Sequence, residues 1–397
     1  MAFYMKEVYI LGAKRSAIGN LLGSLSSLSA VELGSLVASD LVSQFPYPID
    51  EVIIGQVLTS SLGQNPARQI TIKALKDSKR HPFEIPAYTI NKVCGSGLKS
   101  VALGATSILH GDGQLILAGG VESMSNAPHT AMLRKGTKMG NVNFVDTMSY
   151  DGLTDVFSGK AMGITAENIA NKFNITREQQ DRFAYESQVK AAAAAKNGRF
   201  KDEITPINLT VKKQTVIVDQ DEFIRPDTTL ESLAKLRPAF IENGTVTAGN
   251  SSGINDGAAF VLLGSDDFVK SNNLKPLVRV VSFASAGVDP DIMGTGPIPA
   301  TRLALKKAGW SVNDLDVIES NEAFAAQSLC VLQELGLDPA KVNINGGAIA
   351  LGHPIGASGT RVLVTLIHEL KRQGKKRGLA TLCIGGGMGI AMCIEAV

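Results

Sequence analysis

Apolar runs alternate with stretches of helical period in the first 120 residues of the chain. The runs at 7–11, 51–58 and 115–120 are apolar almost throughout, and residues 28–44 repeat apolar positions at helical spacing. Strands that are apolar on both faces are typical of a sheet that helices cover on both sides. The pattern therefore predicts an α/β fold.

The alternation breaks between Val121 and about Ala248, where polar loops with several methionines follow the apolar runs. One helix is strongly indicated there, because Thr176 and Gln179 form a capping box and helix-forming residues continue to Gly198. Loops this long inside a compact chain usually serve a function. We therefore expect a large, mostly helical insertion whose loops cover a site.

From about Leu274 the alternation returns and resembles the first part of the chain. Residues 356–361 are similar to 95–99, and 380–387 are similar to the strand that ends at Gly120. The two pairs lie at nearly the same separation, which indicates a duplicated α/β unit, with chance similarity between glycine-rich turns as the alternative. Loops from both halves would then meet where the strands end, the usual place for a site in open α/β sheets. The expected division is an N-terminal half over 1–120 completed by about 249–270, an insertion over 121–248, and a C-terminal half over 271–397.

Composition narrows the classes of partner and compartment. The 397 residues carry 39 basic and 37 acidic side chains, a formal net charge of +2, so nothing favours nucleic acid or an anionic membrane. The four cysteines are too few for a disulfide scaffold, which fits a reducing compartment. There is no secretory segment, no targeting leader and no apolar run of about 18 residues. We expect a cytoplasmic protein that does not enter a membrane.

Cys94 is the first candidate for chemistry. It lies between a predicted strand at 87–90 and a predicted helix that begins near Leu98, and small residues follow it. A thiol at a helix N-terminus is close to the positive end of the helix dipole and to free N–H groups, which favour the thiolate. The alternative is a small, buried, apolar cysteine.

Three further residues stand at turns. His353 lies on a loop between a glycine and a proline, where a histidine more often faces a ligand than packs in a core. Cys383 ends an apolar strand before Gly385, and the glycines there free backbone N–H groups to point at an oxyanion. Asn321 follows another strand and is by itself more simply a helix N-cap. The cysteines and the histidine lack the local spacing of a zinc site, so we expect no metal.

Four short segments, in this order along the chain, resemble the signature segments of the thiolases, and residues 244–259 are a fifth, long match. Separated motifs in the family order and at its spacing are a specific signal, and they cover nearly the whole chain. The four segments are Val93-Cys94-Gly95-Ser96-Gly97, Asn321-Glu322-Ala323-Phe324, Gly352-His353-Pro354 and Cys383-Ile384-Gly385-Gly386-Gly387.

The resemblance implies a catalytic role for each motif. Cys94 would be the nucleophile that stores an acyl group as a thioester, and His353 would accept its proton and later stabilise an oxyanion. Cys383 would remove an α-proton from the second acetyl-CoA, and each thiol could be tuned towards a neutral pKa. Asn321, through a held water, and His353 resemble the first oxyanion hole of the family. The backbone N–H groups of Cys94 and Gly385 resemble its second.

The resemblance also implies that the insertion holds coenzyme A or acetyl-CoA, as a substrate and not as a permanently bound cofactor. Arg225 and Ser232 fall where the family contacts the nucleotide part, and Ser252 falls where it meets the pantetheine arm. Met162 and Phe324 resemble residues that line the acyl end. The simpler alternatives are a surface charge for Arg225 and a core position for Met162.

The implied fold has duplicated α/β halves, with mixed sheets covered by helices in alternating layers, and the implied assembly is a homodimer or homotetramer. The implied activity is the reversible Claisen condensation of two acetyl-CoA molecules to acetoacetyl-CoA and coenzyme A. Ala161 stands where many short-chain biosynthetic thiolases have histidine, which opens volume near the acyl pocket. The first alternative is therefore a 3-ketoacyl-CoA thiolase of fatty-acid β-oxidation. A decarboxylating ketoacyl synthase and a non-catalytic thioester-binding protein are the others.

Overall fold

The computed structural model describes residues 6–397 except 77, 78 and 80. A ten-stranded mixed sheet runs through it in the order β12-β13-β14-β11-β1-β10-β5-β3-β4, and β2 pairs with β10. The longest apolar runs of the sequence become strands that are buried over their whole length, such as β5 and β10. The strands of this sheet are β1 (Val8–Arg15), β2 (Gly19–Asn20), β3 (Glu51–Gly55), β4 (Ala87–Ile90), β5 (Leu115–Ser123), β10 (Asn255–Ser265), β11 (Val278–Gly287), β12 (Val317–Ser320), β13 (Arg377–Ile384) and β14 (Met388–Ala396).

The two ends of the sheet have the same topology. β3 pairs parallel with β5, β5 pairs antiparallel with β10, and β10 pairs antiparallel with β1. β12, β13, β14 and β11 repeat this order and these directions. A short antiparallel pairing of β1 with β11 joins the two halves. The structure therefore confirms the predicted α/β fold of duplicated halves.

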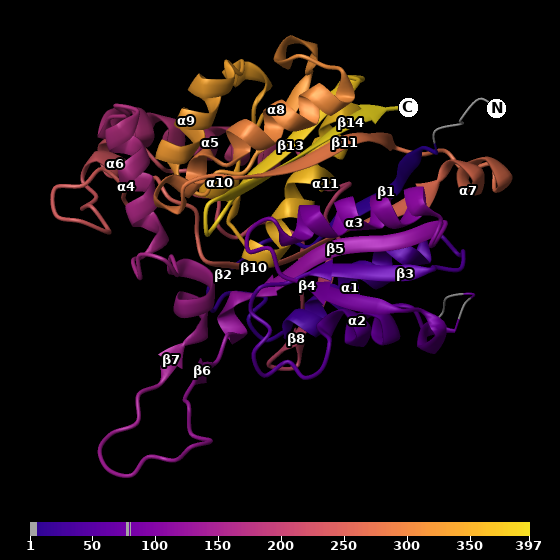
Figure 1. Cartoon of the computed structure of the whole chain (residues 1–397), viewed down its shortest axis with the longest axis horizontal. Helices are drawn as coiled ribbons and strands as arrows, with labels where there is room; N and C mark the ends of the chain where they lie inside the picture. The colour runs from indigo at the N-terminus through magenta and orange to yellow at the C-terminus, as the bar shows by residue number, and fades with distance from the viewer. Residues whose placement is uncertain (1–5, 77–78, 80) are drawn as a thin grey trace.

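Helices lie on both faces of each half, so that helices and strands alternate in layers (Figure 1). α3 and α11 pack against each other in the middle, α3 on β3 and β5, and α11 on β12 and β13 as well as on β5 and β10. α1 covers the outer face of the N-terminal half with α2 beside it, and α8 covers the outer face of the C-terminal half with α9 beside it. The helices of the two halves include α1 (Ala30–Ser43), α2 (Pro66–Ala74), α3 (Ser96–His110), α8 (Pro297–Ala308), α9 (Ala325–Leu335) and α11 (Ile355–Gln373), and the short α10 (Ala348–Leu351) precedes α11.

The segment between β5 and β10 is less helical than the sequence indicates. The capping box of Thr176 and Gln179 is present and opens the long helix α5, as predicted. β5 runs on to Ser123, and an antiparallel hairpin of β8 and β9 follows α5. The elements here are β6 (His129–Thr130), β7 (Val145–Asp146), a π-helical turn (Met148–Leu153), α4 (Met162–Lys172), α5 (Arg177–Lys196), β8 (Ile207–Val211), β9 (Gln214–Val218) and α6 (Leu230–Ala234). The expected boundaries at residues 120, 248 and 271 stay predictions.

Residues 127–147, which include β6 and β7, form an extended arm that projects from the body of the molecule (Figure 1). Met132 and Met139 on this arm are 98% and 93% exposed. In the part of the chain that the structure describes, none of the helices has the length and apolar character needed to span a membrane.

Candidate active site

Cys94 lies in a tight turn between β4 and α3, as the sequence predicts. The Ser96 hydroxyl accepts the N–H of Lys92 at 2.8 Å and donates to the carbonyl of Val93 at 2.6 Å, so one side chain closes the turn. Val93 has φ of 47°, a conformation that a β-branched residue rarely adopts. Such strain persists where the surrounding structure imposes it, and here it fixes the direction of the next side chain, Cys94.

His353 lies between α10 and α11 and is held on two sides. Its backbone N–H donates to Asn255 Oδ1 at 2.9 Å, and its Nδ1 lies 2.6 Å from Ser358 Oγ. The Ser358 hydroxyl donates to the carbonyl of Pro354 at 2.9 Å, so the ring must donate to Ser358 through an Nδ1–H. This tautomer leaves Nε2 as an acceptor, and Nε2 has no hydrogen-bond partner among the described residues.

The imidazole of His353 is neutral. Burial, together with the charge of Arg361, lowers its pKa to about 3. A neutral ring with an unpaired Nε2 can accept a proton, which is what a base beside a thiol must do.

Cys383 is fully buried near the end of β13. It packs in an apolar cluster with Phe324, Met293 and Val246. Burial raises its pKa well above the usual range, and interaction with Cys94 adds to this effect. The two thiols are therefore neighbours, although β13 and the turn after β4 belong to opposite ends of the sheet.

The Cys94 thiol is also less acidic than the sequence suggests. Burial raises its pKa to about 11, although the N–H groups of Gly385 and of Cys94 itself donate to it and lower the value. The expectation that the start of α3 makes this thiol acidic is therefore wrong for the free protein. Loss of hydration outweighs the helix N-terminus.

A cavity of about 480 Å³ opens onto this region. Most of its wall is apolar, with few polar groups, which suits a pocket that orients a ligand by a few polar contacts. The sequence-predicted residues in its wall are Cys94, Met162, Arg225, Ser252, Phe324, His353 and Gly385, and Ala161 lies beside Met162.

Asn321 comes directly after β12 and is fully buried, just outside the cavity wall. Neither its side-chain oxygen nor its side-chain nitrogen has a hydrogen-bond partner among the described residues. An N-cap would use that oxygen to accept a backbone N–H, so the simpler prediction for this residue does not hold. A buried amide with both ends unpaired is suited to binding a small polar group.

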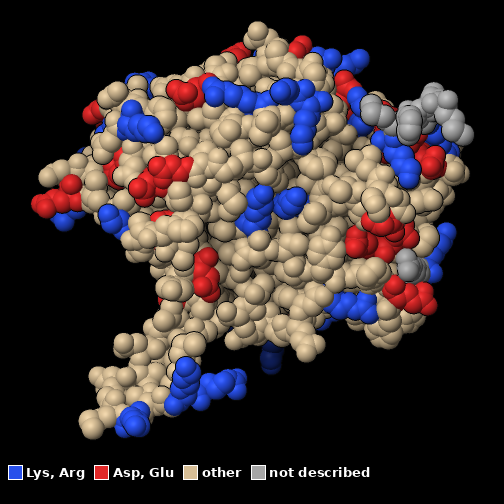
Figure 2. Space-filling model, in the orientation of Figure 1, with Lys and Arg blue, Asp and Glu red and all other residues tan. Residues whose placement is uncertain are grey.

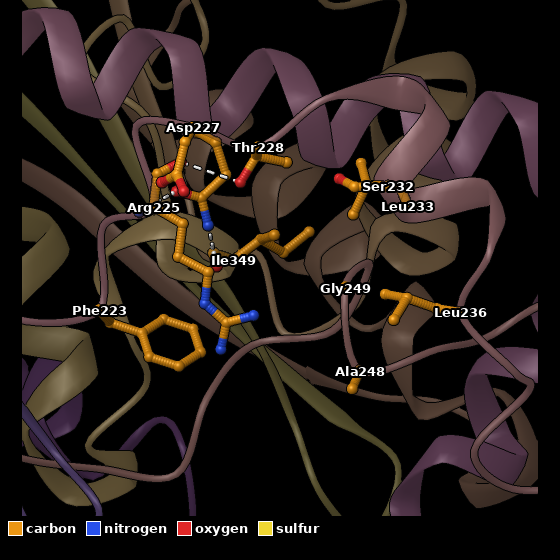
Figure 3. Close-up of a pocket in the computed structure, with 11 residues that line it drawn as sticks. Phe223, Arg225, Asp227, Thr228, Ser232, Leu233, Leu236, Ala248, Gly249 and Ile349 are labelled. Carbon is orange, nitrogen blue, oxygen red and sulfur yellow. Dashed lines mark hydrogen bonds between the residues drawn. The ribbon is translucent and has the colours of Figure 1, made fainter.

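Arg225 and Ser232 line a second cavity, of about 390 Å³ (Figure 3). The Arg225 guanidinium lies over the ring of Phe223, 5.0 Å from its centroid, and both residues also line the first cavity. The Ser232 hydroxyl is exposed on α6 and donates to the carbonyl of Thr229. The two cavities thus adjoin at Arg225, and Ser232 is the one predicted site residue at the far end.

Sequence reasoning missed the residues that hold the site from behind. Ser358 and Asn255 fix His353, and the buried carboxylate of Glu122 lies beside the turn of Cys94. Glu122 had a visible signal, because a carboxylate at the end of a wholly apolar strand is rarely buried without a purpose. In the described residues, no group of three or more His, Cys, Asp and Glu side chains could hold a metal ion.

Comparison with known proteins defines the class to which this fold and site belong. The family models for the thiolase N-terminal and C-terminal domains match residues 8–267 and 274–396. The chain is therefore a member of the thiolase family, as its motifs predict.

Similar full-length relatives carry one name. The chain is 56% identical over 392 residues to acetyl-CoA acetyltransferase of Rhizobium meliloti, with 98% of each chain covered. It is 56% identical over 395 residues to acetyl-CoA acetyltransferase of Pseudomonas aeruginosa, covering 98% of this chain and 99% of the relative.

The solved structures include two activities. Acetyl-CoA acetyltransferase of Bacillus anthracis superposes with a TM-score of 0.95 at 43% identity, over 99% of both chains. Human mitochondrial 3-ketoacyl-CoA thiolase superposes with a TM-score of 0.95 at 44% identity, over 99% of this chain and all of the other.

Proposed function

We propose that the protein is an acetyl-CoA C-acetyltransferase, an acyltransferase that condenses two acetyl-CoA molecules reversibly to acetoacetyl-CoA and coenzyme A. One observation carries this proposal: Cys94 and neutral His353 line one cavity, the buried thiol of Cys383 is a neighbour of Cys94, and the N–H of Gly385 donates to the Cys94 sulfur. The names of the full-length relatives support the choice of substrate.

In the first step the sulfur of Cys94 attacks the carbonyl carbon of acetyl-CoA. The thiol proton moves to Nε2 of His353 and then to the sulfur of coenzyme A, which leaves as a thiol. The products are an acetylated Cys94 and free coenzyme A. The N–H groups of Cys94 and Gly385 are the donors available to the oxyanion of this step.

In the second step the thiolate of Cys383 takes an α-proton from another acetyl-CoA. The resulting carbanion attacks the Cys94 thioester, a carbon–carbon bond forms, and Cys94 leaves as a thiolate that recovers its proton from Cys383. The reacting form is the thiolate, which is the minor form of a thiol whose pKa burial raises, and that thiolate is a strong base towards a weakly acidic proton. The unpaired side-chain amide of Asn321 is a donor for the enolate oxygen, and His353 joins it when its Nε2 carries a proton.

Coenzyme A has a continuous path along the two cavities. Arg225 and Ser232 would contact its nucleotide part, Ser252 its pantetheine arm, and Met162 and Phe324 would line the acyl end. It binds as a substrate in this proposal, and no group is held permanently.

We propose a homodimer or a homotetramer in the cytoplasm, acting in lipid metabolism. β4 ends the sheet, and each of its four residues is half-buried in the single chain. The arm at 127–147 exposes apolar side chains, and the charged residues it shows in Figure 2 are Lys and Arg. Large exposed apolar patches mark interaction sites. Light scattering of the purified protein tests this, and a monomer contradicts it.

The deciding experiment measures thiolysis of acetoacetyl-CoA and of 3-ketohexadecanoyl-CoA side by side. We expect acetoacetyl-CoA to be preferred, and Cys94→Ala and Cys383→Ala to lose about 10³-fold or more in kcat. Cys330→Ala is the matched control, because Cys330 is buried like Cys383 but lies on α9 in another cluster. Activity that survives in Cys94→Ala contradicts the covalent mechanism.

A 3-ketoacyl-CoA thiolase is the second candidate, and one observation favours it. Ala161 contributes only a methyl group to the cavity wall beside Met162, and the human mitochondrial 3-ketoacyl-CoA thiolase has the same fold. Equal or better turnover of the long substrate would establish it. Condensation that requires a malonyl thioester would favour a ketoacyl synthase. Coenzyme A binding without an acetylated Cys94 in the intact mass would favour a non-catalytic carrier.

A further inference from the structure

Glu122 is a buried carboxylate to which the proposed mechanism gives no role. It is the last but one residue of β5, and its side chain is fully buried. A carboxylate in such a place is costly unless it is well paired. Its partners are backbone N–H groups from two other elements.

The carboxylate binds three N–H groups. Oε1 accepts from Leu58 at 3.0 Å, and Oε2 accepts from Val57 at 3.1 Å and from Gly356 at 2.8 Å. Val57 and Leu58 form the loop after β3, and Gly356 lies in the first turn of α11. N–H groups in a first turn lack an intrahelical acceptor, and the N-cap residue of α11, Pro354, has no side-chain acceptor to offer. Glu122 thus caps α11 from another strand.

The same two elements form the wall behind the nucleophile. Cys94 packs against a cluster that contains Ile355 and both residues of the loop after β3. The fit is tight, since a Cβ on Gly356 would lie 2.6 Å from Glu122 Oε2. We propose that Glu122 is a positioning residue, whose one carboxylate fastens the loop after β3 and the start of α11 to β5 and thereby fixes the wall against which Cys94 rests. This inference depends on the proposed role of Cys94.

The charge of Glu122 provides a way to observe the effect of this residue on Cys94. Burial, helped by the charge of Asp256 on β10 and opposed by the three N–H groups, raises the pKa of Glu122 to about 7. The Glu122 charge in turn raises the pKa of Cys94. Above about pH 7 the carboxylate is therefore ionised and opposes the thiolate, whereas below that pH it is neutral and does not.

The test follows alkylation of Cys94 by iodoacetamide between about pH 6 and pH 9, read by mass spectrometry of the Cys94 peptide. The proteins are the wild type, Glu122→Gln, Glu122→Asp and the control Glu369→Gln. Glu369 is an equally buried carboxylate at the far end of α11, bound by Asn345 and Gln373 and paired with Arg372 and Arg199. Melting temperatures show which variants are folded.

We expect Glu122→Gln to react at the wild-type rate near pH 6 and about threefold faster near pH 9, because the neutral side chain no longer raises the pKa of Cys94. Glu122→Asp keeps the charge but is too short to reach all three N–H groups, so it should keep the wild-type pH profile and lose about tenfold in kcat. Glu369→Gln should change neither. A rate ratio for Glu122→Gln that does not depend on pH, or an unchanged kcat in Glu122→Asp, overturns the proposal. Alkylation reports the thiol itself, so this result is independent of whether Cys94 proves to carry the acyl group.

Discussion

Replacing Ser358 by alanine tests whether the tautomer of His353 controls the reaction. The Ser358 hydroxyl accepts a hydrogen bond from the Nδ1–H of His353 at 2.6 Å and donates its own O–H to the carbonyl of Pro354. Both side chains are buried, so the ring has little access to another acceptor. The variant Ser358→Ala leaves the Nδ1–H without its partner.

The size of the effect follows from that burial. A buried donor without a partner costs about 1–3 kcal/mol. The ring can escape this cost by moving the proton to Nε2, and the same free energy corresponds to about 5- to 150-fold in the ratio of the tautomers. With its proton on Nε2 the ring cannot accept the proton of Cys94. We therefore expect kcat to fall about 5- to 150-fold, with little change in KM, because Ser358 lines neither of the two cavities assigned to coenzyme A.

The assay is steady-state thiolysis of acetoacetyl-CoA together with a thermal melt. Ser328→Ala is the matched control, because Ser328 is equally buried in a helix but its hydroxyl has no partner among the described residues. If the ring keeps its tautomer, the cost appears in the melting temperature instead, at about 1 °C per kcal/mol for a chain of this length. A Ser358→Ala protein that matches Ser328→Ala in both kcat and melting temperature refutes the reasoning.

Three further predictions concern other parts of the site and core. Asn321→Ala should lose about 10²–10³-fold in kcat without a fall in melting temperature, because the Asn321 side-chain amide forms no hydrogen bond with a described residue. A destabilised protein contradicts this. Arg225→Ala should raise KM for coenzyme A in thiolysis and leave kcat within about twofold, since Arg225 lies where the cavity of Ser232 adjoins the cavity of Cys94. A fall in kcat alone contradicts this. Burial raises the pKa of Glu319 to about 8, so its contribution to the free energy of unfolding is present at low pH and is lost as pH rises through about 8. Urea unfolding at several pH values measures this dependence, and Glu319→Gln should make the free energy of unfolding vary less with pH.

The sequence predicted the parts of the site that depend on local structure. The turn at Cys94 follows from a short strand, small residues and a helix that are neighbours in the chain, and the structure has it as expected. The two halves follow from apolar runs, because a strand covered on both faces leaves a clear pattern. The hairpin of β8 and β9 was missed although six of its ten strand residues are apolar, because it lies in the segment that was expected to be mostly helical.

The chemical state of the site was not predictable in this way. The helix dipole at Cys94 is a local property, whereas the burial that raises its pKa to about 11 comes from segments far away in the sequence. The same holds for His353, whose neutral state depends on burial and on Arg361. Loss of hydration is a property of the assembled core, so a motif identifies a reactive residue more readily than it identifies its protonation.

The internal duplication explains how residues so far apart in sequence reach one place. The glycines that repeat between the halves, Gly97 and Gly359, lie where α3 and α11 touch. A Cβ on Gly97 would lie 2.7 Å from the N of Thr360, and a Cβ on Gly359 would lie 2.3 Å from the N of Leu98. Only glycine permits backbones to come this close.

The close contact of α3 with α11 determines which residues meet at the starts of these two helices. Cys94 comes just before α3 and His353 just before α11, so the contact of the helices through their first turns brings the nucleophile to its base. β13 of the second half then supplies Cys383 from the strand that corresponds to β5 of the first. The repeat therefore has a functional consequence, because the packing of α3 on α11 that it imposes brings the site residues together.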